Sequence, residues 1–327
     1  MSMQQRDLTV LSDNRHFAKH YKGFARVRYW AGIYLGFAKA WLKLWKTLRT
    51  KECYYGPFKG EFGHFLAHNL PFIAYLHSRG VKIYYCGMKL HSPFLVDEKG
   101  NSLVAEYYQL RDFFAEVPPR LNRAIPPADV QQEIEAFHQK AQASGLPYWN
   151  ISDEYYYWFI HRSWLLKGRH LHYPDLSKVY RTATEKSCVL FPRSKGAASS
   201  LNNGEAWDYD ELAELLSPYF DKVYITGHPS QTIAVRERGN IVLRISADNR
   251  NVLETCANAS LIITQHSGAV YLADYVPAQV LIIYKGGTQI GSLVNTLRFR
   301  GTRAVSKPFH YAFSTHEIVT FVKNQFA

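Results

Sequence analysis

The amino-acid sequence predicts an α/β protein built from two units, each with a parallel sheet. Short apolar runs of strand character alternate with helical patterns, which is typical of parallel sheets covered by helices. The alternation occurs in two blocks, the first beginning near residue 52 and the second near residue 186. A chain of 327 residues with 47% hydrophobic residues is long enough for two domains that each bury a core.

The composition is that of a globular protein, with 15% aromatic residues and no low-complexity tract. The four cysteines lie far apart and form no CxxC pair, so we expect reduced thiols, without disulfides or a zinc site. They are Cys53, Cys86, Cys188 and Cys256. The opening MSMQQRDLTV lacks the pattern of a secretory signal, and no apolar run reaches the roughly 18 residues that cross a bilayer. We therefore expect a cytoplasmic protein.

The net charge of +12 is concentrated in one segment. Residues 14–51 contain ten Lys or Arg and no Asp or Glu, whereas the rest of the chain is nearly neutral. Apolar residues at a helical period give this segment an amphipathic stripe. The stripe consists of Trp30, Ile33, Tyr34, Phe37, Trp41, Leu44, Trp45 and Leu48.

Tryptophan and lysine on one helix favour binding to the surface of an anionic membrane. The residues predicted to bind the membrane are Trp30, Trp41, Trp45, Lys39, Lys43 and Lys46. Packing of the stripe on the protein's own body is the alternative interpretation. Single-stranded nucleic acid also binds basic and aromatic residues, but the strict helical period argues against a nucleic-acid groove. We therefore expect no nucleic-acid partner.

The first block predicts a βαβ unit, with strands at 52–56 and 81–86 and a helix at 65–78 between them. Further helices are expected at 128–144 and 153–167. Residues 89–127, which contain two Pro-Pro pairs, give no clear pattern.

The second block predicts strands at 187–191, 223–226, 241–245, 260–264 and 279–284. Helices are expected at 208–216, 249–259 and 315–326. We thus expect three parts: a basic aromatic amphipathic segment at 1–51 and two Rossmann-like domains, at 52–175 and 176–327. Ligands of such sheets bind beyond the carboxyl ends of the strands, so the cleft between the two domains is the expected site.

The loop after the first strand, GPFKGEFGHFLAHN, carries a carboxylate and an imidazole, Glu61 and His64. Either is suited to general base catalysis near neutral pH. Glu61 alternatively stabilises the start of the following helix through its negative charge. His64 and His68 have the spacing of a metal pair, but no third ligand accompanies them.

The loops that follow the strands of the second block contain basic and polar residues that suit an anionic ligand. Arg193 and Lys195 follow the strand 187–191 and suit a phosphate or a sugar carboxylate, although a solvated basic loop is an equal alternative. His228 and Pro229 follow the next strand, where His228 is able to donate to a phosphate oxygen. Glu254 is expected either to accept hydrogen bonds from ribose hydroxyls or to lie on an exposed helix face.

The run SLIITQHSGAV places a polar turn between a buried strand and a helix. Free N–H groups at the start of a helix bind anions. We expect Gln265 and His266 to face the cleft, Ser267 to cap the helix and Gly268 to let a phosphate approach the N–H of Ala269.

The stretch DNRNVLETCANASLIITQHSGAVYLADYVPAQVLIIYKGG, residues 248–287, resembles the donor-binding domain of bacterial heptosyltransferase-like enzymes of the GT-B fold. His228-Pro229 together with Ser267 resembles the pattern of sialyltransferase-like and Kdo-transferase-like enzymes. The loop YYGPFKGEFGHFL resembles the N-terminal Gly-rich loop of capsule and lipopolysaccharide GT-B enzymes.

The resemblance implies a glycosyltransferase that moves a sugar from a nucleotide-sugar donor to a lipopolysaccharide, O-antigen or capsule acceptor. It further implies that no metal ion or other cofactor is needed. Together with the basic aromatic segment, it predicts an enzyme that works at the inner face of the cytoplasmic membrane. Two alternatives stay open: a sugar-nucleotide epimerase of the same fold, and a non-catalytic membrane-associated protein that binds nucleotides or glycans.

Overall fold

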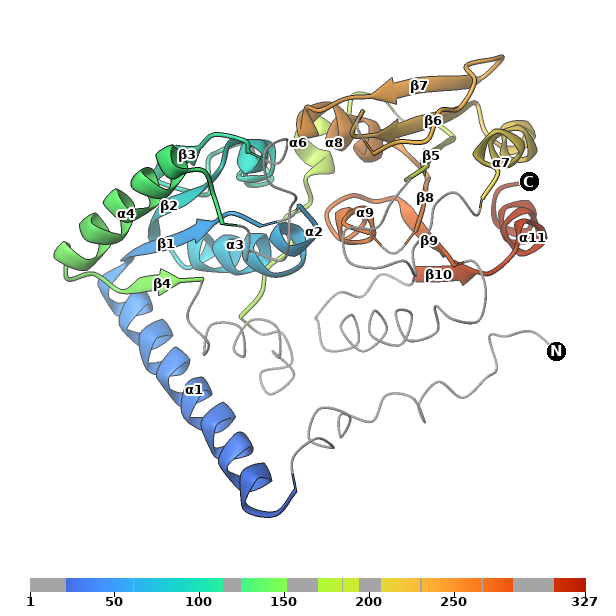
Figure 1. Ribbon diagram of the computed structural model, residues 1–327. Coiled ribbons are helices and arrows are strands. Elements are labelled where there is room, and N and C mark those ends of the chain that lie inside the picture. Colours follow the sequence, from blue (N-terminus) through green and yellow to red (C-terminus); the bar gives the residue numbers. More distant parts are fainter. Residues whose placement is uncertain are drawn as a thin grey trace.

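The computed structural model describes residues 22–60, 62–113, 125–151, 170–183, 185–193, 207–229, 231–265, 267–284 and 309–327. These residues form two sheets whose strands are all parallel, with helices packed on them (Figure 1). The predicted α/β class with parallel sheets is thus confirmed. The predicted helix at 153–167 lies outside the described residues.

The first sheet has the strand order β3-β2-β1-β4. Its strands are β1 (Glu52–Phe58), β2 (Lys82–Met88), β3 (Glu106–Leu110) and β4 (Tyr148–Asn150). The βαβ unit predicted from the first block is confirmed, because β1 and β2 pair in parallel around the helical residues 62–78. The outer strands β3 and β4 were not predicted from the sequence.

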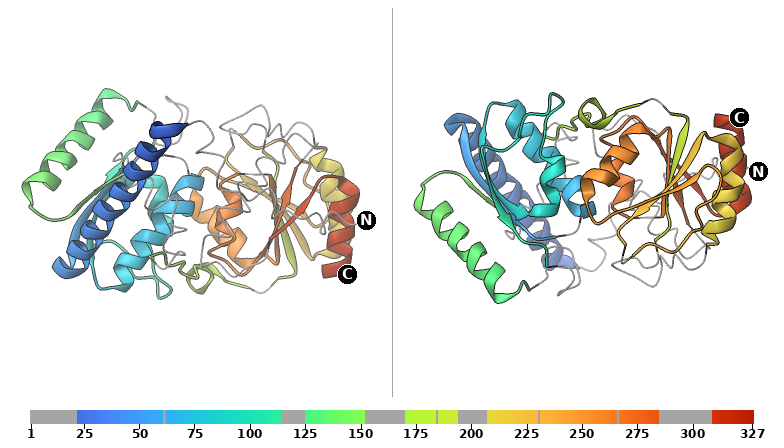
Figure 2. Two further views of the ribbon diagram at one scale, coloured as in Figure 1. Left: turned by 90° about the horizontal axis from the view of Figure 1, so that it is seen from below. Right: turned by 90° about the horizontal axis from the view of Figure 1, so that it is seen from above.

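Alternate residues of β1 point to opposite faces of the first sheet. Cys53 and Tyr55 face α1 (Gly23–Thr50) and α3 (Leu70–Ser78), whereas Tyr54 faces α4 (Ala128–Ala143). Figure 2 shows α1 and α4 on opposite sides of this sheet. Between β1 and α3 lie the short helix α2 (Phe62–His64) and a π-helical turn, Phe65–Asn69.

The second sheet has the order β10-β9-β8-β5-β6-β7. Its strands are β5 (Ser187–Phe191), β6 (Lys222–Gly227), β7 (Ile241–Ile245), β8 (Leu261–Gln265), β9 (Gln279–Ile283) and β10 (Phe309–Ala312). Its helices are α6 (Ser177–Tyr180), α7 (Tyr209–Leu216), α8 (Asn249–Asn258), α9 (Ala269–Leu272) and α11 (Thr315–Phe326). Strands β5 to β9 begin and end within one residue of their predicted bounds, and α7, α8 and α11 are the three predicted helices.

Both faces of the second sheet are covered. Leu190 and Ile263 pack with α7 and α11 on one face, and Val189 and Ile262 pack with α8 on the other. Side chains cap the starts of the covering helices, as sequence rules predict. Asp208 accepts from the N–H of Glu211, Asp248 from that of Arg250 and Ser314 from that of Glu317.

The two sheets present their carboxyl edges to each other, as the arrowheads of β1 and β7 show in Figure 1. Three side chains of the second unit donate to backbone carbonyls of the first. Tyr275 Oη donates to Leu66 O at 2.6 Å, Asn249 Nδ2 to Leu90 O at 2.9 Å and Tyr180 Oη to Pro93 O at 2.6 Å. Buried apolar residues of both units form one continuous cluster across this junction.

Two glycines permit the closest approach between the units. A Cβ atom on Gly63 would lie 2.8 Å from the Cα of Gly268, and one on Gly268 would lie 2.9 Å from the N of Gly63. Non-bonded carbon atoms do not approach so closely. The turn after β8 and the helix after β1 therefore meet backbone to backbone.

Replacing Gly63 with Ala should lower the free energy of unfolding by about 1–3 kcal/mol, because the new methyl group forces the two backbones apart. Urea denaturation followed by tryptophan fluorescence measures this change. Gly32 is the control, since a Cβ there has nothing within 4 Å and Ala favours the interior of α1. Equal stability of Gly63→Ala and Gly32→Ala would contradict the close contact.

Candidate ligand site at the facing sheet edges

His64 is the described member of the predicted catalytic pair, because Glu61 lies outside the described residues. It ends α2 and is half-buried, and its ring centroid lies 5.3 Å from that of His68. A buried link holds the π-helical turn beside it: Tyr55 Oη donates to Asn69 Oδ1 at 3.0 Å, and Asn69 Nδ2 donates to the carbonyl of His64 at 3.2 Å. These two bonds hold His64 at the carboxyl end of β1.

Burial lowers the pKa of His64 from 6.5 to about 4, because removal from water disfavours the imidazolium. At neutral pH the ring is therefore uncharged and able to accept a proton. A pKa this low makes it a weak base until an anion is bound beside it, since a nearby negative charge stabilises the imidazolium.

The structure brings Arg193 and His228 to one place. Arg193 follows β5, and its backbone bridges to Thr232, whose Oγ1 donates to the carbonyl of His228 at 2.7 Å. The strands β5 and β6 are neighbours, so these two residues share a sheet edge. Arg193 is half-buried, whereas His228 and Pro229 are exposed. Lys195 lies outside the described residues.

Gln265 does not face the cleft, and this expectation was wrong. Its side chain is buried, and its Nε2 donates to the phenolic oxygen of Tyr209 at 2.7 Å. The backbone of Arg193 bonds to the same phenol, so Tyr209 ties the ends of β8 and β5 together. Gln265 thus supports the position of Arg193 through Tyr209. The sequence pattern alone does not distinguish a polar residue that contacts a ligand from one that makes a buried hydrogen bond.

Ser267 was expected to cap the helix after β8, but the N-cap position of α9 is Gly268, one residue later. Its hydroxyl bonds to Thr264 Oγ1 at 3.0 Å and accepts from the N–H of Ala269 at 3.3 Å. The N–H that was expected to bind a phosphate is therefore already engaged with Ser267. The side of Gly268 that lacks a Cβ is filled by Phe62 and Gly63. A phosphate site at this turn stays a prediction, and His266 lies outside the described residues.

Glu254 is paired within its own helix. Its Oε1 accepts from Arg250 Nε at 2.9 Å, four residues earlier on α8, and its side chain is 40% exposed. The expected role toward a ribose therefore requires that Glu254 leave or share this partner, and it stays a prediction.

A groove of about 540 Å³ lies between the two units. It is lined by the 3-10 helix Lys89–Phe94 after β2, by the residue Asp112, and by α6 and the start of α8. The full lining is Lys89, Leu90, Ser92, Pro93, Asp112, Tyr180, Ala247, Asp248, Asn249 and Arg250. Two cations and two carboxylates thus face one space, together with hydroxyl and amide groups that suit the hydroxyls of a sugar. This set was not predicted from the sequence, because half of it falls in residues 89–127, whose pattern indicates no helix or strand.

Within the described residues, no group of three or more His, Cys, Asp or Glu side chains could hold a metal ion. In the same residues, no helix is both long enough and apolar enough to cross a membrane.

The structure is similar to solved structures of glycosyltransferases. A glycosyltransferase of family 9 from Veillonella parvula shares 12% identity, with 83% of this chain and 88% of that chain covered and a TM-score of 0.49. Escherichia coli heptosyltransferase WaaC, solved with ADP-2-deoxy-2-fluoro heptose, shares 10% identity over 84% of this chain and 99% of that chain, with a TM-score of 0.47. Escherichia coli ADP-heptose lipopolysaccharide heptosyltransferase II shares 12% identity over 84% of this chain and 97% of that chain, with a TM-score of 0.44. No protein family model and no curated protein sequence matches the chain.

His91 is buried in the first unit, where its ring stacks on that of Phe65 with centroids 4.3 Å apart. Neither ring nitrogen has a hydrogen-bond partner among the described residues, and burial lowers the pKa of His91 from 6.5 to about 3. The folded state therefore binds fewer protons than the unfolded state between about pH 6.5 and pH 3. Stability contributed by the neutral ring is present above this window and is lost as the pH falls through it.

Replacing His91 with Phe should preserve the stacking and remove this proton uptake. The difference in unfolding free energy between pH 7 and pH 5 should shrink by about 2 kcal/mol relative to the unmodified chain. Urea denaturation at the two pH values measures it. The exposed His316, replaced in the same way, is the control and should leave the difference unchanged. An unchanged difference in His91→Phe would show that His91 is protonated normally in the folded chain.

Proposed function

We propose that this chain is a glycosyltransferase of the GT-B type that uses a nucleotide-sugar donor. One observation carries the proposal: the carboxyl edges of two parallel sheets face each other, with a polar groove between them. Parallel α/β sheets bind their ligands beyond these edges. Two sheets that face each other in this way offer one substrate surface each, which suits the transfer of a group between two substrates.

The donor is assigned to the edge of the second sheet. Arg193 and His228 lie together there, and Lys195 follows Arg193 in the sequence. A guanidinium group binds phosphate oxygens through paired, charge-assisted hydrogen bonds. Arg193 and Lys195 would stabilise the negative charge that develops on the nucleotide as the glycosidic bond breaks, which is the contribution that a divalent metal makes in other enzymes, and His228 would donate a hydrogen bond to a phosphate oxygen. In this proposal the reaction needs no metal or other cofactor.

The acceptor is assigned to the edge of the first sheet, where Glu61 or His64 would remove the proton from its attacking hydroxyl. Neutral His64 is able to accept this proton, and the bound anionic donor would raise its pKa toward the working pH. The acceptor would be a glycan or glycolipid of the cell envelope, and the enzyme would work at the inner face of the cytoplasmic membrane. An epimerase acting on the same nucleotide sugar is the second candidate, and it would need no acceptor at all.

Replacing Arg193 with Ala should weaken binding of the nucleotide sugar about tenfold to a hundredfold, because a charge-assisted bond to phosphate is lost. His228→Ala should weaken it by a smaller factor. Calorimetric titration against UDP-, GDP-, CMP- and ADP-linked sugars identifies the donor and measures both changes.

Arg79→Ala is the matched control, since Arg79 follows α3 and so lies at the amino edge of β2, away from the facing edges. If Arg193→Ala and His228→Ala bind the donor as tightly as Arg79→Ala does, the donor assignment is wrong.

Of Glu61→Ala and His64→Ala, the variant that removes the base should lower kcat by at least about a hundredfold. Donor affinity should change little in either variant, because both residues follow the first strand in the sequence and the donor is assigned to the second sheet. Steady-state transfer assays give kcat, and the same titrations give the affinity for the donor. Full kcat in both variants would exclude the first sheet as the source of the base.

A further inference from the structure

The helix α1 carries two different apolar faces. One face packs on the first unit through Phe37, Ala40 and Leu44, all buried, and through Thr47, whose Oγ1 accepts from Trp149 Nε1 at 3.0 Å. The stripe predicted from the sequence therefore combined buried and exposed residues, and its alternative interpretation, packing on the protein's own body, holds for this face.

The second face is exposed to solvent. Each of six large apolar residues on it has another member of the set three, four, seven or eight positions away, so they align along one side of the helix. This exposed stripe consists of Val27, Tyr34, Leu35, Trp41, Leu42 and Trp45. Leu35 and Leu42 are 64% and 68% exposed, and Trp45 is 60% exposed. Single exposed apolar residues are common, but a continuous stripe of this kind marks a surface that another apolar phase covers.

Basic residues border the exposed stripe. Arg28, Lys39 and Lys46 follow each other at intervals of eleven and seven residues, which places them on one edge of it, and all three are exposed. The sequence of α1 contains six Lys or Arg and no Asp or Glu. Trp30, by contrast, is half-buried, and Lys43 is turned inward to donate to the carbonyl of Tyr148 at 2.7 Å. The roles predicted for Trp30 and Lys43 in membrane binding stay predictions.

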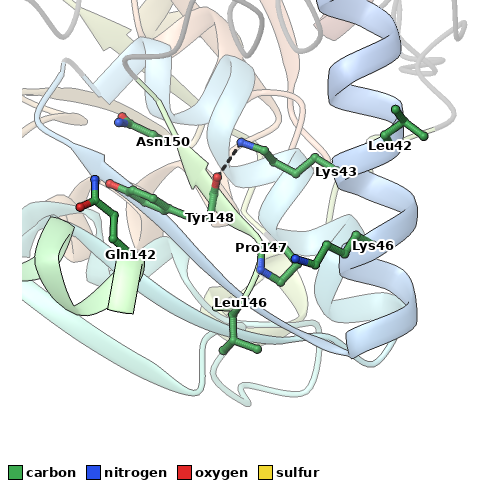
Figure 3. A pocket seen from close by; sticks show the side chains of 8 residues that line it. All are labelled: Leu42, Lys43, Lys46, Gln142, Leu146, Pro147, Tyr148 and Asn150. Atoms are coloured by element: carbon green, nitrogen blue, oxygen red, sulfur yellow. Dashed lines mark hydrogen bonds between the residues drawn. The ribbon is translucent and has the colours of Figure 1, made fainter. Parts of the chain in front are cut away.

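A depression of about 560 Å³ opens beside the basic edge, between α1 and β4 (Figure 3). Leu42 of the exposed stripe and Lys46 of the basic edge both line it. Its other lining residues are Lys43, Gln142, Leu146, Pro147, Tyr148 and Asn150. The lining contains two lysines and two amides but no carboxylate, so it matches a group that is anionic and accepts hydrogen bonds.

We infer that the exposed stripe and this depression together dock the protein on an anionic phospholipid surface. The stripe lies among the acyl chains just below the headgroups, where tryptophan and tyrosine are favoured. The basic edge and the depression receive the phosphates of the headgroups. Charge complementarity selects this occupant, because a stripe that paired with a second copy of the chain would bring two basic edges together. The inference rests on the membrane location given in the proposed function, but not on the chemistry of transfer.

Sedimentation of the full chain with vesicles tests the inference. Vesicles of phosphatidylcholine with phosphatidylglycerol should bind the protein, and vesicles of phosphatidylcholine alone should bind it at least tenfold more weakly. Reversing one charge with Lys46→Glu should lower partition about thirtyfold, and the double variant Trp41→Ser, Trp45→Ser should lower it at least tenfold. Raising the salt concentration should weaken binding to the anionic vesicles.

Matched controls lie on the second unit. Lys323→Glu reverses an exposed charge on α11, and Leu215→Ser removes a 38% exposed leucine from α7. Both should sediment as the unmodified chain does. Equal binding to neutral vesicles, or unchanged binding of the Trp41, Trp45 double variant, would overturn the inference. So would a dimer, seen by analytical ultracentrifugation, that the same double variant dissociates.

The calorimetric titrations separate this inference from the proposed function, because sedimentation requires no nucleotide sugar. Binding to anionic vesicles without binding of any nucleotide sugar would support the docking surface and contradict the proposed function. Binding of a nucleotide sugar without binding to vesicles would support the proposed function and contradict the docking surface.

Discussion

The backbone contact between Gly63 and Gly268 is the constraint on which the arrangement of the two units depends. Each glycine lies in the segment that follows a central strand, β1 in the first sheet and β8 in the second. Because these segments touch, Tyr275 reaches Leu66, and Asn249 and Tyr180 reach the turn after β2. The contact closes the junction at its centre, and space for a ligand remains where the loops diverge, in the groove beside α8.

The second sheet could be predicted almost completely from the sequence, whereas the outer strands of the first could not. Strands such as Ser187–Phe191 are buried on both faces and therefore appear as continuous apolar runs. By contrast, β3 has the sequence EYYQL with one buried residue, and β4 has only three residues, so neither carries a period long enough to recognise. Their places are set by pairing with β2 and β1, which is a tertiary effect.

The candidate site was predictable in its position but not in the roles of its residues. The end of a buried parallel strand locates a polar residue at the facing edge, and this holds for Arg193, His228 and Ser267. It does not say whether the side chain turns outward. Gln265 turns inward because it donates to Tyr209, which is far away in the sequence. Glu254 pairs with Arg250 on its own helix, a contact that the pattern of strands does not indicate.

The helix α1 also shows what a sequence pattern does not predict, namely which apolar face is buried and which is exposed. A sequence period identifies an amphipathic helix, but a helix whose apolar residues cover more than half of its circumference can bury only one sector against its own protein. Here Thr47 and Lys43 fix that sector, by bonding to Trp149 and Tyr148, both in β4. The exposed stripe thereby has a fixed orientation relative to the first sheet. If α1 lies in the plane of a membrane, that plane also fixes the direction in which the carboxyl edge of the first sheet, and His64 on it, face the bilayer.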